Sequence, residues 1–318
     1  MAETNVNNMK LTVGTRGSKL ALTQTNTVLD SLRAFHPEAT FEVKIVKTLG
    51  DEDAKNPLFT IDRRGIFEKE LGVAIAKGEI DLAVHSLKDV PTEETPDNVI
   101  AAILKRGSPH DVLISKNRVP LEALPDCGVV GTGSLRRLAE VKHLRPDLQV
   151  KAIRGNVDTR IRKVNEGEFD GAIVAEAGLE RMGINSFIAE RFSLDKFTPA
   201  AGQGALAVTA KKGNHEVINL LRAIDDPFTR AEVAAERALV LALEGGCRVP
   251  IGAIGRANEK GLSLYACVFS LDGGEKITSS ADAAVSEAEE LGRQIAKDLL
   301  RQGAKEFEAQ WRQKYGPW

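Results

Sequence analysis

Three kinds of residue in this chain could carry chemistry: one cysteine, one carboxylate and a group of arginines. The cysteine, Cys247, follows Gly245-Gly246 and precedes Arg248. Glycines remove side-chain bulk beside the sulfur, and a neighbouring cation favours the thiolate, which is the reactive form of the thiol. Cys247 is therefore a candidate for a covalent bond to a large group. A helix end followed by a small buried cysteine would give the same local pattern.

The candidate carboxylate is Asp89. It lies in His85-Ser86-Leu87-Lys88-Asp89-Val90-Pro91, directly after a strand predicted at 81–84. Polar residues just past the carboxyl end of a buried α/β strand lie where ligands usually bind. A carboxylate at such a point can stabilise positive charge or move a proton. The local sequence also fits a simple helix or turn cap.

A set of arginines lies at predicted strand ends and helix starts. Its members are Arg136, Arg137 and Arg154, and Arg160 follows on the next predicted helix. Guanidinium groups bind carboxylates through two parallel hydrogen bonds, which lysine cannot reproduce. This placement suits a ligand with several carboxylates. A solvated helix face with surface ion pairs is the alternative, and it fits Arg162 better than the others.

The composition argues against several classes of protein. Lys plus Arg number 43 against 45 Asp plus Glu, and 5% of the 318 residues are aromatic, so neither a nucleic-acid surface nor a membrane surface is indicated. The sequence has no run of 18 apolar residues and no apolar export signal after Met1. The three cysteines lack metal-ligand spacing, which predicts a reducing, cytoplasmic location and no metal site.

The first third of the chain predicts an α/β domain. Strands are predicted at 10–13, 41–47 and 81–84, and helices at 18–36 and 65–77. Ser18 is a good N-cap for the first helix, and Arg16 adds charge to a glycine-bearing turn that can bind an anion. The irregular segment 48–64 is long for a compact domain and is predicted to be a lid.

Two segments of this domain recur later in the same order. Val13–Ser18 (VGTRGS) is echoed at Val130–Ser134 (VGTGS), and Gly78–Val84 (GEIDLAV) is echoed at Gly167–Ile173 (GEFDGAI). The echoes indicate two similar α/β domains. A further strand predicted at 205–209 follows the second domain, so the chain is expected to return to the first domain there.

Beyond residue 214 the pattern changes to that of an α+β domain. We expect a helix that ends at 223, helices at 227–243 and 286–301, strands near 251 and at 262–270, and a polar tail to 318. The predicted domains are 1–104 together with 205–222, then 105–204, then 223–318.

Taken together, these motifs resemble those of the porphobilinogen deaminase (hydroxymethylbilane synthase) family. The segments that carry the resemblance are Gly14–Ser18, His85–Pro91, Gly131–Arg137, Arg154–Arg160, Gly202–Ala205 and Glu244–Pro250. They run in order along the chain, and the end of the third domain matches only loosely. The resemblance implies two similar periplasmic-binding-protein-like α/β domains flanking a cleft, plus a smaller C-terminal α+β domain.

The resemblance also implies an activity. In this family the cysteine that matches Cys247 holds a dipyrromethane cofactor by a thioether, and the enzyme builds this cofactor from its own substrate. Four porphobilinogen units are added in turn to the free end of the cofactor, each with loss of ammonia, and hydrolysis releases linear hydroxymethylbilane. The chain would be a transferase of tetrapyrrole and heme biosynthesis. It would be a cytoplasmic monomer whose partner is the small molecule porphobilinogen, with no nucleic acid and no membrane.

Each candidate residue receives a role from the resemblance. Asp89 would be the catalytic residue, because a carboxylate can stabilise the positive charge on a pyrrole ring nitrogen and can move protons. The cofactor-binding residues would be Cys247, Lys88, Asp89, Thr132, Ser134, Arg136, Arg137 and Asn156. The substrate-binding residues would be Arg16, Ser18, Arg154, Arg160 and Gln203. Arg64 and Phe67 would belong to the lid, and no metal is implied.

Three positions depart from the common family pattern. Arg63-Arg64-Gly65 stands where Gly-Lys-Gly is frequent, so the anion contact of the lid would be an arginine. Gly133 replaces a common serine, and Lys19 replaces a frequent proline. None of these positions is Cys247 or Asp89, so we expect them to affect substrate affinity rather than activity itself.

Two other classes of protein remain open on the residues alone. A duplicated α/β pair also describes anion-binding sensors and solute-binding proteins, which have no use for Cys247 and would carry no covalent adduct. A cysteine-nucleophile acyl transferase or hydrolase would need a basic histidine near Cys247. Among the five histidines, His85 is the one in a predicted site loop.

Overall fold

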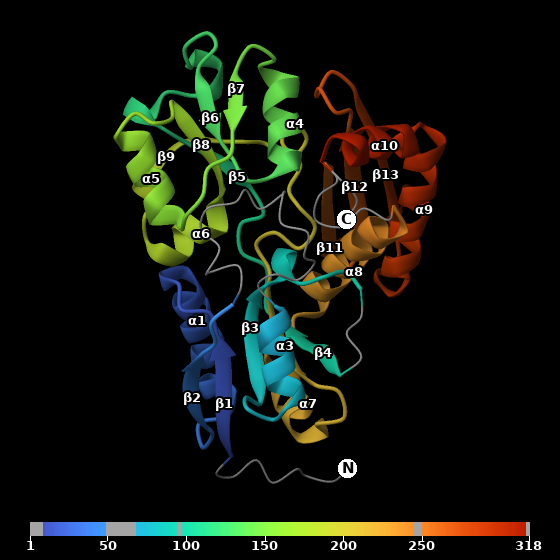
Figure 1. Ribbon diagram of the computed structural model, residues 1–318. Coiled ribbons are helices and arrows are strands. Elements are labelled where there is room, and N and C mark those ends of the chain that lie inside the picture. Colours follow the sequence, from blue (N-terminus) through green and yellow to red (C-terminus); the bar gives the residue numbers. More distant parts are fainter. Residues whose placement is uncertain (1–8, 49–67, 94–96, 244–249, 316–318) are drawn as a thin grey trace. The chain divides into compact units, whose positions relative to one another are not determined.

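The computed structural model describes residues 9–48, 68–93, 97–243 and 250–315 (Figure 1). These residues form two compact units. The first unit takes its described residues from Met1–Asp53, Gly65–Gly107 and Ala205–Arg230, and the second takes them from Ser108–Gly204 and Ala231–Trp318. Arg64, Phe67 and Cys247 lie outside the described residues, as does the predicted lid at 48–64 except for Thr48.

The first unit is built on a five-stranded sheet with the order β2-β1-β3-β10-β4. Its strands are β1 (Lys10–Thr15), β2 (Thr40–Ile45), β3 (Leu82–Ser86), β4 (Asn98–Ile103) and β10 (Leu206–Lys211). Strand β1 is parallel to β2 and β3, whereas β10 is antiparallel to β3 and β4. The strand predicted at 205–209 is therefore part of the first sheet, as expected.

Helices cover both faces of this sheet. They are α1 (Lys19–Phe35), α3 (Lys69–Ala76) and α7 (His215–Leu221). Apolar residues of α1 and α7 share one core with Leu82 and Val84, whereas α3 packs on the opposite face with Ala83. Leu29 and Leu32 are buried three residues apart on α1, which is the spacing that gives a helix one apolar face.

The second unit contains a five-stranded sheet with the order β7-β6-β8-β5-β9. Its strands are β5 (Asp111–Ser115), β6 (Val129–Gly131), β7 (Gln149–Lys151), β8 (Gly171–Ala175) and β9 (Ile188–Arg191). Strand β6 is parallel to β7 and β8, and β5 is antiparallel to β8 and β9. Its helices are α4 (Leu135–Leu144), α5 (Val157–Asn165) and α6 (Glu176–Met182).

The two sheets match strand for strand. The echoed segments supply β1 and β6 at the second position of each sheet and β3 and β8 at the third. The two directions of pairing also agree, since in each sheet the first three strands are parallel and the last two pair antiparallel. The prediction of two similar α/β domains is confirmed.

A third, antiparallel sheet lies in the C-terminal part of the second unit. Its strands are β11 (Ile251–Asn258), β12 (Gly261–Phe269) and β13 (Lys276–Ala283), in that order. Its helices are α8 (Pro227–Ala242), α9 (Ala288–Arg301) and α10 (Ala304–Tyr315). This is the predicted α+β fold, although the domain boundaries given above remain predictions. Single-turn helices complete the fold: η2 (Leu87–Asp89), η3 (Lys116–Arg118), η4 (Leu121–Ala123), η5 (Asn185–Phe187), η6 (Arg222–Ile224) and η7 (Val285–Glu287).

The expected polar tail is wrong, because residues Ala304–Tyr315 form helix α10. Phe307 and Trp311, one helical turn apart, are both buried. The indole N–H of Trp311 donates to the carbonyl oxygen of Phe269 at 3.0 Å. The sequence did not predict this helix, because its few apolar residues are separated by charged ones and show no clear helical period.

Helix α4 joins the second sheet to the third. Leu135 and Ala139 on α4 pack in one core with Cys267, Phe269 and Trp311. At the far end of α4, the Nδ1 atom of His143 lies 2.8 Å from the carbonyl oxygen of Gly273. The third domain therefore packs along the helix whose N-terminus carries Arg136 and Arg137. Within the described ranges, every helix is too short or too polar to cross a membrane.

Candidate active site

Asp89 lies at the carboxyl end of a buried strand. Strand β3 has four buried residues in a row, and the chain then turns through η2 (Leu87–Asp89). Leu87 is buried and its N–H donates to the carbonyl oxygen of Ala205 at 3.0 Å, while the N–H of Val90 donates back to Leu87 at 3.0 Å. This turn leaves Lys88 and Asp89 half-buried. Within the described part of the chain, the Asp89 carboxylate caps no helix.

The residues before Asp89 are fixed by polar contacts to the same unit. The Nε2 atom of His85 lies 2.8 Å from the hydroxyl of Thr209, and the amide of Gln24 donates to the hydroxyl of Ser86 at 2.9 Å. Burial lowers the pKa of His85 to about 4, so the imidazole is neutral and weakly basic. This weakens the hypothesis of a cysteine nucleophile with His85 as its base.

Arg16 and Ser18 lie where the sequence places them, between β1 and α1. The hydroxyl of Ser18 accepts a hydrogen bond from the N–H of Ala21 at 3.2 Å, which confirms its role as N-cap. A Cβ atom at Gly14 would lie 2.2 Å from Cδ1 of Ile80, so any larger residue there would displace the Ile80 side chain. Arg16 is half-buried beside this turn.

The corresponding turn of the second unit leads from β6 into α4. The Thr132 hydroxyl accepts from the N–H of Ser134 at 3.1 Å, and the Ser134 hydroxyl accepts from the N–H of Arg137 at 3.5 Å. Thr132 is buried and Ser134 half-buried. The two hydroxyls predicted to bind the cofactor therefore also shape the N-terminus of α4.

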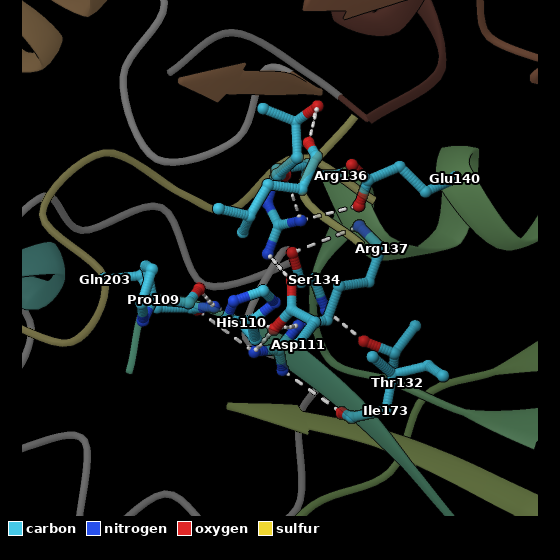
Figure 2. Close-up of polar contacts among 12 residues, drawn as sticks. Pro109, His110, Asp111, Thr132, Ser134, Arg136, Arg137, Glu140, Ile173 and Gln203 are labelled. Atoms are coloured by element: carbon cyan, nitrogen blue, oxygen red, sulfur yellow. Dashed lines mark hydrogen bonds and ion pairs between the residues drawn. The ribbon is translucent and has the colours of Figure 1, made fainter. Parts of the chain in front are cut away.

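Arg136 and Arg137 converge on a buried carboxylate that the sequence reasoning missed, Asp111 (Figure 2). Oδ2 of Asp111 accepts from Nη2 of Arg136 at 2.7 Å. Oδ1 accepts from Nε and Nη2 of Arg137 at 3.0 and 2.6 Å. Asp111 is the first residue of β5 and pairs with Ala175, the last residue of β8, so it lies at the carboxyl edge of the parallel strands. The signal for Asp111 in the sequence was its position as the one charged residue at the start of the apolar run DVLIS.

Gln203 belongs to the same network. Its Nε2 atom donates to Oδ1 of Asp111 at 2.9 Å and to the carbonyl oxygen of Pro109 at 2.8 Å, and its Oε1 accepts from Arg137 at 3.3 Å. The neighbouring Gly202 has a φ of +74° and donates its N–H to the buried carboxylate of Glu236 at 2.6 Å. Glu236 also accepts from the N–H of Gly255 on β11 at 2.7 Å. The loop is thus held by Asp111 through Gln203 and by Glu236 through Gly202.

Asn156, Arg154 and Arg160 gather at the start of α5. Asn156 is the N-cap residue, although its side chain makes no capping bond. Nε of Arg160 donates to the carbonyl oxygen of Gly155 at 3.0 Å. Gly155 has a φ of +104°, and a Cβ atom there would lie 2.6 Å from Thr159. Arg154 and Arg160 are half-buried.

The structure therefore distributes the predicted site residues over three places. Thr132, Ser134, Arg136, Arg137 and Gln203 come together at the N-terminus of α4. Arg154, Asn156 and Arg160 share the start of α5, also in the second unit. Arg16, Ser18, Lys88 and Asp89 belong to the first unit. Their predicted roles toward cofactor and substrate remain predictions.

Comparison with known proteins gives the same family over most of the chain. Residues 11–219 match the family model described as porphobilinogen deaminase, dipyromethane cofactor binding domain, and residues 230–301 match its C-terminal domain. The chain is 41% identical to the probable porphobilinogen deaminase of Nitrosopumilus maritimus, over 98% of this chain and 99% of the relative. It is 46% identical to the porphobilinogen deaminase of Desulforudis audaxviator, over 95% and 98%.

Among solved structures, the chain is similar to a probable amino-acid ABC transporter extracellular-binding protein from Bacillus subtilis. The identity is 13% and the TM-score 0.39, over 68% of this chain and 90% of that chain.

Proposed function

Because this chain belongs to the porphobilinogen deaminase family, we propose that it joins four porphobilinogen molecules, one at a time and each with loss of ammonia, to a covalently bound dipyrromethane primer. Hydrolysis then releases linear hydroxymethylbilane. The observation that carries the proposal is the half-buried Asp89 at the carboxyl end of β3, within the segment matched by the cofactor-binding domain.

The side chains at the N-terminus of α4 suit a cofactor of this chemistry. Dipyrromethane carries acetate and propionate groups, and the α4 N-terminus offers guanidinium groups, the hydroxyls of Thr132 and Ser134, and the positive end of a helix dipole. When bound, the cofactor supplies the free pyrrole position to which each new unit is joined. We assign its attachment to Cys247 and its binding to Lys88, Thr132, Ser134, Asn156 and the Arg136–Arg137 pair.

Asp89 is the proposed catalytic residue. Its carboxylate would accept hydrogen bonds from pyrrole N–H groups and stabilise the positive charge that develops on the ring nitrogen. It could also deliver a proton to the departing amine or remove one from the attacked carbon. A partly buried carboxylate is suited to this, because charge interactions strengthen where water is scarce. The η2 turn holds Asp89 on a rigid strand end rather than on a long loop.

Carboxylates of the incoming substrate are assigned to a second group of residues. These are Arg16 and Ser18 of the first unit and Arg154, Arg160 and Gln203 of the second. Arg64 and Phe67 keep their proposed place in a lid. We also propose that the protein is a cytoplasmic monomer with three domains. We propose no nucleic-acid or membrane partner, because the composition indicates neither kind of binding.

The experiment that tests the proposal is the intact mass of the purified protein. The wild type should be heavier than its sequence by two pyrrole units after loss of ammonia, and should consume porphobilinogen. Cys247→Ser should lack both the added mass and the activity. The matched control is Cys127→Ser, which removes an exposed thiol and should keep both. An unmodified wild type that is fully active would contradict the proposed attachment. A protein that binds porphobilinogen without consuming it would favour the sensor alternative.

A further inference from the structure

Two elements of the third domain flank Cys247 in the sequence, since α8 ends at Ala242 and β11 begins at Ile251. We infer that Glu236 of α8 is a positioning residue that joins both elements to the loop carrying Gln203. Through this carboxylate, the elements on either side of the proposed attachment point are fixed relative to the side chains proposed to bind the cofactor. The inference rests on the proposed function, which gives Glu236 no role.

Both carboxylate oxygens of Glu236 accept hydrogen bonds from backbone N–H groups. Oε2 accepts from Gly202 at 2.6 Å, and Oε1 accepts from Gly255 of β11 at 2.7 Å. Bonds that a carboxylate accepts from N–H groups are short and roughly twice as strong as neutral ones. Glu236 is fully buried, so these bonds act in a medium of low dielectric constant. One side chain of α8 therefore holds a strand and a loop that are distant in the sequence.

Strand β11 also contacts the segment that leads into this loop. A Cβ atom at Gly252 would lie 2.8 Å from the carbonyl oxygen of Thr198, so a side chain there would not fit. The N–H of Ala253 donates to the carbonyl oxygen of Pro199 at 2.9 Å. The start of β11 is thus packed directly against residues 198–199, and the loop that follows them comes within reach of Glu236.

Gln203 connects the loop to the buried network at the N-terminus of α4. Its neighbours Gly202 and Gly204 have φ values of +74° and +90°, in the left-handed region that favours glycine. The Gln203 Nε2 atom donates to Oδ1 of Asp111 at 2.9 Å, and its Oε1 accepts from Arg137 at 3.3 Å. A shift of Gly202 away from α8 would therefore move the Gln203 side chain relative to this network.

This positioning bears on the loading of the cofactor. In the proposed function, loading joins the Cys247 sulfur to pyrrole units that other side chains hold. Such a reaction is fast only when both partners are held in a defined geometry, and a displacement of about 1 Å can cost about 100-fold in rate. Loss of the Glu236 hydrogen bonds should therefore slow loading even in a folded protein.

The first experiment compares two glutamates of α8. Glu236→Gln keeps the size of the side chain but has one acceptor oxygen in place of two, so it loses one of its N–H partners. The matched control is Glu232→Gln, because the buried Glu232 lies one turn earlier and accepts from the N–H of Ala257 on the same strand at 3.0 Å.

Full-length variants are produced in cells that cannot make porphobilinogen and are then incubated with it, and loading is followed by intact mass. Glu236→Gln should load about 10- to 100-fold more slowly than the wild type, and Glu232→Gln within about threefold of it. Rates are measured well below the unfolding midpoint of each variant. Equal rates for the two variants would overturn the inference, because a purely structural role predicts no difference between them.

The second experiment asks whether Glu236 acts through the loop. Gln203→Leu removes the hydrogen bonds that tie the loop to Asp111 and Arg137. In a Gln203→Leu background, Glu236→Gln should therefore slow loading by no more than about threefold further. Two effects that simply multiply would contradict this coupling. If Glu236→Gln does not fold, Glu236→Asp, which is one methylene shorter and cannot reach both N–H groups, replaces it in both experiments.

A third measurement needs neither porphobilinogen nor a variant. The dipeptide Ala-Gly occurs twice in the sequence, at 177–178 and 201–202, so ¹³C-carbonyl alanine with ¹⁵N-glycine selects the amide signals of Gly178 and Gly202. The Gly202 proton should lie clearly downfield, because a short bond to a carboxylate deshields it. A Gly202 signal in the ordinary amide range would overturn the inference. A wild type that neither loads nor consumes porphobilinogen would instead refute the proposed function, and the amide signal would still test the contact with Glu236.

Discussion

His85 should make the stability of the protein sensitive to acid. Burial lowers the pKa of this imidazole to about 4, from 6.5 in an exposed site. Between these two pH values His85 is protonated in the unfolded chain and neutral in the folded protein. The stabilising contribution is therefore fully present above pH 6.5 and is lost as the pH falls toward 4. Because His85 lies four residues before Asp89, we expect acid to inactivate the protein by destabilising the strand end that carries Asp89.

The size of the effect follows from the shift. A difference of 2.5 pKa units (6.5 minus 4) corresponds to about 3 kcal/mol at full protonation. By pH 4.5, about 2.5 kcal/mol of this should already be lost. The variant His85→Gln cannot titrate, and its amide can still donate to the hydroxyl of Thr209, which lies 2.8 Å from Nε2 in the wild type. As the pH falls to 4.5, this variant should therefore lose about 2.5 kcal/mol less of its unfolding free energy than the wild type does.

The assay is urea unfolding of both proteins at pH 7.5 and pH 4.5, followed by circular dichroism. Other groups titrate in this interval, so the quantity of interest is the difference between the two proteins in their loss of unfolding free energy. His215→Gln serves as the matched control, because His215 is an exposed histidine in the same unit and should leave the wild-type pH dependence unchanged. An equal loss in wild type and His85→Gln would refute the reasoning.

Two further predictions concern activity. Asp89→Asn should keep the fold and the cofactor but lower turnover by at least about two orders of magnitude relative to Asp89→Glu, because a neutral amide stabilises a cation far less than a carboxylate does. Turnover at equal cofactor loading measures this, and near-normal activity of Asp89→Asn would remove the residue from the mechanism. Arg16→Leu and Arg154→Leu should retain the cofactor but slow chain extension, at a cost of about 1.5–3 kcal/mol each. Unloaded protein in either case would contradict their assignment to the substrate.

Local patterns in the sequence predicted most of the regular elements. Ser18 caps the helix expected after it, since the capping bond depends only on residues a few positions away. The repeated segments predicted two equivalent sheets, because each repeat is also a short local pattern. Helix α10 was missed because its two buried aromatic residues are diluted by charged neighbours.

The partners of the site arginines could not be predicted in this way. Asp111 and Arg137 are 26 residues apart, and Gln203 follows 66 residues after Arg137. No local pattern reveals that β5 runs antiparallel to β8 and brings Asp111 to the same sheet edge as α4. A single acidic residue before an apolar run looks like the end of a loop. The sequence thus indicated the arginines as candidates, but it did not reveal the carboxylates that hold Arg136 and Arg137.

The order of strands in the first sheet has a consequence for protein synthesis. Strand β4 pairs only with β10 in this sheet, and β10 ends at Lys211. While the ribosome makes the chain, β4 therefore has no partner until more than 100 further residues have been added (211 minus 103). The second sheet needs only the contiguous stretch from Asp111 to Arg191, so it can close earlier. The strand that leads to Asp89 is therefore made before the second sheet, but its own sheet is completed after the second sheet.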